Sequence, residues 1–132
     1  MTKIRRGNPP DFANVRAKIY NHYVEVQNPG SLIFVSGQLS RDENGERVGV
    51  GDMAEQTRQA IRNLERVLKE CGAGLQNVVQ VVVYVTDMRL FRESCAAREE
   101  FFILDLPTST TVEVQHLTDP YLMVEIQAIA VL

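Results

Sequence analysis

The sequence predicts an α+β sandwich in which two helices cover one face of a β-sheet, in the order β-β-α-β-α-β-β. Two segments carry this prediction. Residues 53–71 bear apolar side chains at helical spacing, and residues 78–85 are β-branched at almost every position. A chain of 132 residues is long enough for one globular core. We therefore expect a single domain over residues 15–132, behind a flexible N-terminal arm over residues 1–14 that is rich in glycine and proline.

Each expected element follows from a local pattern. Apolar residues at 15–26 predict a first strand, and a turn at 28–31 separates it from an apolar strand at 32–35. Asp52 is a favoured N-cap for the first helix, with Gln56 as its expected capping-box partner. The remaining expected elements are a strand at 78–85, a helix at about 89–102, and strands at about 110–115 and 122–131.

The strands are more apolar than this arrangement of helices requires. Two helices cover one face of a sheet, yet residues 32–35 and 78–85 are apolar at both strand parities. A strand of that kind is normally buried on both sides. The chain offers no further element for the second face, so we expect another copy to cover it. The alternative is an exposed apolar patch.

Composition excludes several classes of protein. The 14 Lys and Arg against 17 Asp and Glu give a net charge of −3, which argues against a nucleic-acid partner. No apolar run approaches the ~18 residues of a membrane span, and no signal peptide is evident. Two cysteines and two histidines, without metal-ligand spacing, fit a cytoplasmic protein that uses no metal and no cofactor.

Five stretches of the sequence form a distinctive set. They are Leu-Ile-Phe-Val-Ser-Gly-Gln at 32–38, Gln-Thr-Arg-Gln-Ala at 56–60, Val-Val-Tyr-Val-Thr-Asp-Met at 82–88, Glu-Phe-Phe at 100–102, and Val-Glu-Ile-Gln-Ala-Ile-Ala-Val at 124–131. With these stretches the chain resembles the YjgF/Rid proteins, the reactive-intermediate deaminases also described as endoribonuclease-like, over roughly residues 20–132. The resemblance implies a chorismate-mutase-like subunit and a homotrimer with a central barrel, with small-molecule clefts between neighbouring subunits.

The resemblance also implies a substrate-binding site, from which this chain departs. Family members that hydrolyse imines bind the substrate carboxylate with an arginine two residues after a proline. Here Pro107 is followed at that position by Ser109. The usual cysteine two residues later is Thr111, and an asparagine of the second helix is Cys95. The resemblance thus implies a divergent member without the strand arginine, and we expect Ser109, Thr111 and Cys95 to take part in substrate binding.

Other positions keep the family's pattern. Tyr23 and Glu125 are the candidate catalytic residues, and Ser36 and Gly37 are candidate substrate-binding residues. Each has a plainer interpretation. Tyr23 could be an aromatic residue at a strand edge, and Glu125 could be a solvated glutamate. Ser36 and Gly37 could belong to the turn that ends the strand. Arg98 lies one helical turn beyond Cys95 and is a candidate substitute for the missing arginine; the alternative is a solvated helix face.

Two functions remain open at this stage. The first is a small hydrolase of deaminase type that acts on an enamine or imine intermediate of nitrogen metabolism. Residues 115–122 also resemble 2-aminomuconate deaminases. The second is a non-catalytic trimer of the same fold that binds a small metabolite or regulates a partner. The chemistry of an imine hydrolase is modest, because the protein must hold the substrate, place a water and move protons.

Overall fold

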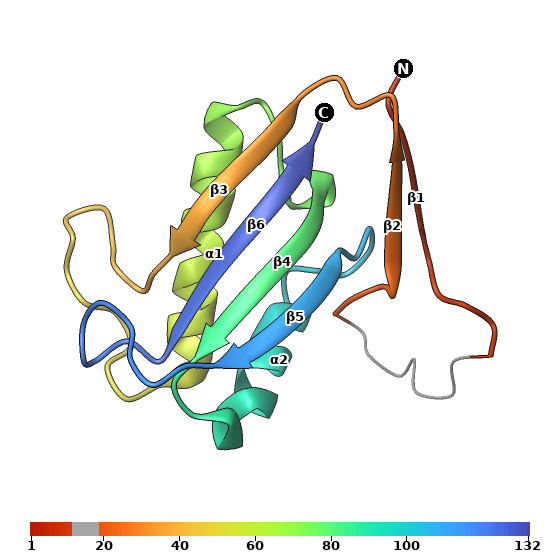
Figure 1. The fold of residues 1–132 in the computed structure, drawn as a ribbon. Coiled ribbons are helices and arrows are strands. Elements are labelled where there is room, and N and C mark those ends of the chain that lie inside the picture. Colours follow the sequence, from red (N-terminus) through yellow and green to blue (C-terminus); the bar gives the residue numbers. More distant parts are fainter. Residues whose placement is uncertain (12–18) are drawn as a thin grey trace.

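A four-stranded sheet backed by two helices forms the body of the protein in the computed structural model, which describes residues 1–11 and 19–132 (Figure 1). The helices are α1 (Met53–Glu70) and α2 (Phe91–Glu99), and both lie behind the same face of the sheet. This confirms the predicted fold class. In their order across the sheet, the strands are β3 (Leu32–Gln38), β6 (Val124–Val131), β4 (Val78–Val85) and β5 (Thr108–Glu113).

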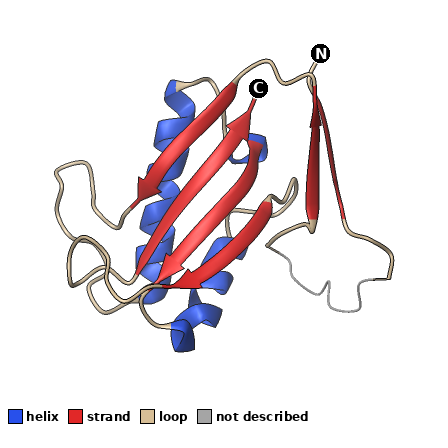
Figure 2. Ribbon diagram, in the orientation of Figure 1, coloured by secondary structure: helices blue, strands red, loops and turns tan. Residues whose placement is uncertain are grey.

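A separate two-stranded sheet precedes this body (Figure 2). Its strands are β1 (Lys3–Gly7) and β2 (Tyr23–Gln27), which pair residue by residue. The expected loose arm is therefore wrong for residues 3–7, because pairing with β2 supplies hydrogen bonds that no local pattern reveals. The chain has one more strand than predicted. The expected strand at 15–26 and the division after residue 14 both extend into a segment outside the described residues.

The core lies between α1 and the sheet. Alternate residues of β6 are buried, as the period of a strand with one face on the helices requires. Strand β4 follows the same alternation with Val81, Val83 and Val85, and α1 contributes Ile61, Leu64 and Leu68. None of the helices in the described part of the chain is long and apolar enough to cross a membrane.

The N-terminus of α1 differs from the expectation in one respect. Asp52 caps the helix as predicted, since its carboxylate accepts a hydrogen bond from the main-chain N–H of Glu55. Gln56 is no capping-box partner. Its buried side-chain amide donates to the carbonyls of Gly49 and Tyr121 and accepts from the N–H of Met123. It therefore connects the loop before α1 to the loop before β6.

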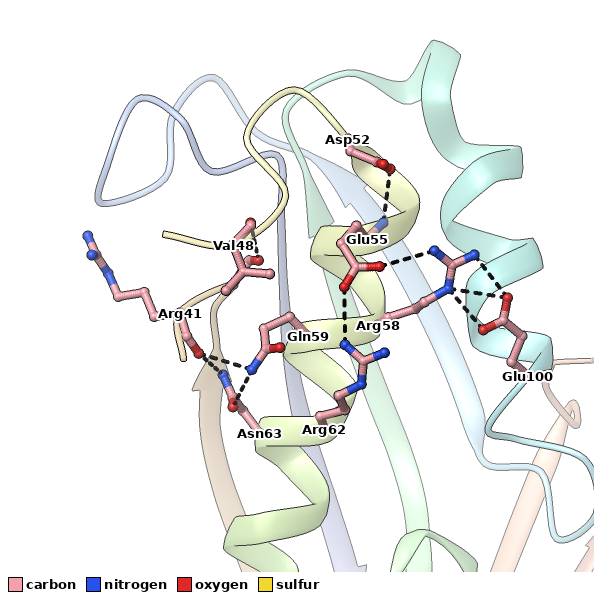
Figure 3. Close-up of polar contacts among 10 residues, drawn as sticks. Arg41, Val48, Asp52, Glu55, Arg58, Gln59, Arg62, Asn63 and Glu100 are labelled. Atoms are coloured by element: carbon pink, nitrogen blue, oxygen red, sulfur yellow. Dashed lines mark hydrogen bonds and ion pairs between the residues drawn. The ribbon is translucent and has the colours of Figure 1, made fainter. Parts of the chain in front are cut away.

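Polar contacts on the outer side of α1 connect it to its neighbours (Figure 3). Arg58 forms ion pairs with Glu55 and with Glu100, which follows α2. Asn63 donates to the carbonyl of Arg41 in the loop after β3. Two short 3₁₀ helices, η1 (Leu75–Asn77) and η2 (Met88–Leu90), precede β4 and α2, so the second helix is shorter than expected.

Candidate active site

Glu125 lies on the face of the sheet that the helices leave open. It stands between the buried residues Val124 and Ile126 in β6, so its side chain points away from them. On β4 its partner is Tyr84, which shares the open face. No hydrogen bond or ion pair of the Glu125 carboxylate occurs within the described residues. The carboxylate is half-buried and available to a ligand.

A β-bulge in β3 brings the main chain of Gly37 against this carboxylate. Val35 pairs with Ala128, but the next paired residue, Gln38, is opposite Ile126, so β3 carries one extra residue. A Cβ built on Gly37 would overlap the carboxylate of Glu125. Only glycine leaves room for the acid here. Gly37 and the Glu125 carboxylate of the same chain therefore lie against each other.

Ser36 precedes Gly37 in the bulge and is exposed. Its main-chain carbonyl accepts a hydrogen bond from the side chain of Gln38. Its hydroxyl is available to a ligand that binds beside Glu125. Together the bulge and the carboxylate offer an acid, a hydroxyl and an unobstructed stretch of main chain on the open face.

A buried arginine occupies the other side of the sheet. Arg98 of α2 is only 1% exposed, and its guanidinium donates to the hydroxyl of Ser109 at 2.7 Å. The alternative of a solvated helix face is therefore wrong. Burial lowers the pKa of Arg98 to about 10. No carboxylate within the described residues lies in ion-pair range of this guanidinium.

Cys95 and Thr111 accompany this arginine. Burial raises the pKa of the Cys95 thiol, although the charge of Arg98 opposes the rise. A thiol with a raised pKa is a poor nucleophile at neutral pH, so the structure favours a packing role for Cys95. Ser109 and Thr111 pair with Val81 and Val83, which are buried under the helices, so both share the helix-covered face.

These geometries match a known family. The family model described as Endoribonuclease L-PSP covers residues 14–132. The chain belongs to this family, the YjgF/Rid proteins. A RutC family protein of Pyrococcus abyssi is 34% identical over 119 residues, which are 90% of this chain and 93% of that protein. The 3-aminoacrylate deaminase RutC of Acinetobacter baylyi is 29% identical over 124 residues, covering 94% and 91% of the two chains.

Other relatives extend the comparison. The 2-iminobutanoate/2-iminopropanoate deaminase of Mus musculus is 32% identical in an alignment of 107 residues that covers 73% of this chain and 77% of that protein. Among solved structures, the Rid protein YyfB of Yersinia pestis has a TM-score of 0.89 at 32% identity, with 98% of each chain covered. Rv2704 of Mycobacterium tuberculosis, with 30% identity, has a TM-score of 0.69 and coverage of 98% and 100%.

The site residues of this YjgF/Rid chain fall into two groups on opposite faces of the sheet. Ser36, Gly37 and Glu125 lie on the open face, whereas Arg98 and Ser109 lie on the face that the helices cover. A small ligand within one chain cannot contact both groups, because the sheet stands between them.

Tyr23 joins neither group. It lies on β2, in the separate two-stranded sheet, where its hydroxyl lies over Gly7 and the guanidinium of Arg5 lies 5.4 Å from its ring centroid. Sequence reasoning missed the open-face neighbours of Glu125. Tyr84 donates a hydrogen bond to Gln127, and both belong to the set that strand alternation places beside the acid.

Proposed function

We propose that this protein is a hydrolase of deaminase type that acts on a small enamine or imine carboxylate of nitrogen metabolism. The reaction converts C=N and water into C=O and ammonia. Its site is a cleft between neighbouring chains of a homotrimer, with one half-site from each chain. The observation that carries the proposal is Glu125, an unpaired carboxylate seated over Gly37 on the open sheet face.

Glu125 is the acid–base group of this mechanism. In its acid form the carboxyl group protonates an enamine carbon or an imine nitrogen, which makes the carbon electrophilic. As a carboxylate it then accepts a proton from the attacking water. Ser36 and the main chain of Gly37 hold the substrate beside it, and Tyr23 of a neighbouring chain supplies a second hydroxyl. The named relatives act on 3-aminoacrylate and on 2-iminobutanoate or 2-iminopropanoate, which supports this class of substrate.

Arg98 binds the substrate carboxylate from the second half-site. A guanidinium prefers the planar, two-oxygen geometry of a carboxylate. In the described part of the chain the Arg98 guanidinium has one hydrogen bond, to Ser109, and no anionic partner, so its remaining donors suit an anion. Cys95 and Thr111 complete the wall around it. Arg98 thereby supplies, from the helix, the cation that position 109 lacks.

The function is tested by ammonia release from freshly generated substrate. The native protein should accelerate hydrolysis of 2-aminoacrylate, 3-aminoacrylate or 2-aminomuconate above the spontaneous rate. Glu125→Gln keeps the shape and removes the proton transfer, so it should lower turnover by about 10²–10⁴-fold. Glu93→Gln, on the exposed side of α2, is the matched control and should keep the native rate.

The opposing outcomes are distinct. If the native protein accelerates none of these reactions, the proposal of a deaminase is wrong. Binding of a small carboxylate without turnover would then support a metabolite-binding trimer. If Glu125→Gln turns over at the native rate, Glu125 is a structural residue and the mechanism must use another acid.

A further inference from the structure

The strand pair β1–β2 is not joined to the strand that follows it in the chain. Residues 28–31 connect β2 directly to β3, and such a short connection usually makes a hairpin. Instead β3 is a border strand, and the strand pair stands beside the opposite border, near the start of β5 (Figure 1). Within the described residues, the outer edge of β3 and the outer edge of β2 both lack a partner.

Specific contacts hold the strand pair in this position. Arg6 of β1 donates to the main-chain carbonyls of Gln76, Val78 and Leu106, around the starts of β4 and β5. Asn21, just before β2, donates from its main chain to the carbonyl of Pro107. Except for Gln76, which is exposed, the acceptor residues are buried or half-buried, so these hydrogen bonds stabilise the position.

The connection is held as well. Gly30 and Ser31 donate main-chain hydrogen bonds to the carbonyl of Leu132, after the end of β6. Asn28 has a φ of 52°, a left-handed conformation that asparagine adopts more readily than most residues other than glycine. The hydrogen bonds to Leu132 therefore fix the connection between β2 and β3 beside the end of β6.

The edge that this arrangement leaves open is apolar. Leu32 and Phe34 of β3 are 56% and 73% exposed. An unpaired strand with large apolar side chains and no charge or proline is a template for pairing with another strand. The chain itself carries the complement, a second unpaired edge of similar length on β2.

We propose that β2 of one chain pairs antiparallel with the outer edge of β3 in a neighbouring chain, so that the chains exchange their N-terminal strand pairs. This contact joins two different surfaces, and repeated head to tail it forms a ring when the rotation between successive chains closes, as in a trimer. We take the register that β2 and β3 would have as a hairpin with the four-residue linker 28–31. In that register Gln27 lies opposite Leu32 and Tyr23 lies opposite Ser36 of the neighbouring chain. The exchange would thus carry Tyr23 to the open-face half-site of the neighbour. The proposed exchange of strand pairs stands whether or not the protein is a deaminase.

Disulfide trapping tests the exchange. In the proposed register Glu25 lies opposite Phe34, and opposite residues of paired strands are close enough for a disulfide. The double variant Glu25→Cys/Phe34→Cys, in a Cys71→Ser background, is oxidised in dilute solution and run on a non-reducing gel. The exchange predicts covalent species of two or more chains. The control Glu25→Cys/Val67→Cys, whose second cysteine lies on the outer side of α1, should stay monomeric.

Two results would overturn the proposal. A monomeric chain with an internal disulfide, identified by its mass and faster migration, would show that β2 folds back onto its own β3. Absence of any disulfide under conditions that oxidise exposed thiols would show that β2 and β3 do not pair. A mixture of the two single variants gives an independent measure, because a disulfide between them forms only if the strands belong to different chains.

Discussion

Replacing Arg98 with methionine removes a buried charge that has no anionic partner among the described residues. Burial lowers the pKa of Arg98 from its ordinary value to about 10, so at roughly 1.4 kcal/mol per pKa unit folding disfavours the charged form by on the order of 3 kcal/mol. Loss of the hydrogen bond to Ser109 offsets about 1.5–3 kcal/mol of that gain. Arg98→Met should therefore be as stable as the native chain or more stable.

The pH dependence has a defined sign. Because the folded-state pKa lies below the unfolded one, the unfolded chain binds more protons than the folded chain at pH values above about 10. The destabilisation by Arg98 is therefore present in full at neutral pH and is relieved only as the pH rises through about 10. Near pH 7 the destabilisation is therefore measured by the substitution Arg98→Met, because a change of pH in that range does not alter it.

The assay is urea unfolding of the native chain, Arg98→Met and the exposed control Arg92→Met, each with and without propanoate. Propanoate at 100 times its dissociation constant should stabilise the native chain by about 2.7 kcal/mol and leave Arg98→Met unchanged. Arg92→Met should behave as the native chain does. If Arg98→Met loses several kcal/mol, or still gains stability from propanoate, the guanidinium is structural and the carboxylate-binding role is refuted.

Three further substitutions or reactions follow from the geometry. Gly37→Ala should displace the Glu125 carboxylate and lower turnover at least about tenfold, as measured by ammonia release, with little change in the thermal midpoint. Gln56→Leu should cost about 2–5 kcal/mol in chemical denaturation, because the carbonyl of Tyr121 and the N–H of Met123 lose the hydrogen-bond partner that they have among the described residues. Iodoacetamide at pH 7.5 should label exposed Cys71 well before Cys95, whose pKa is raised by burial; equal rates, by peptide mass, would contradict this.

The elements with strong periodicity were predictable. Residues 53–70 and 78–85 form a helix and a strand because each has one side buried in the same core. The strand at 3–7 was not predictable, since its partner lies across an intervening segment and its own sequence is basic. Pairing between distant segments leaves no local pattern.

The site was predictable in part. Strand parity correctly assigns Glu125 to the face away from the helices. The pattern around Arg98, with glutamates and another arginine nearby, is that of a solvated helix, and only the packing of α2 against β5 reveals its burial. The separation of the half-sites by the sheet also requires knowledge of which strands pair.

The central claim is that one chain contributes Glu125 and its neighbour contributes Arg98 to each active cleft. Mixing the variants Glu125→Gln and Arg98→Met under conditions that exchange subunits tests it directly. Each variant alone should be almost inactive. In a random equimolar mixture, about a quarter of the clefts would contain both native residues, so ammonia release should recover to about a quarter of the native rate. A mixture no more active than the average of its two components would contradict the account, because it would show that both residues act within one chain or that they do not share a site.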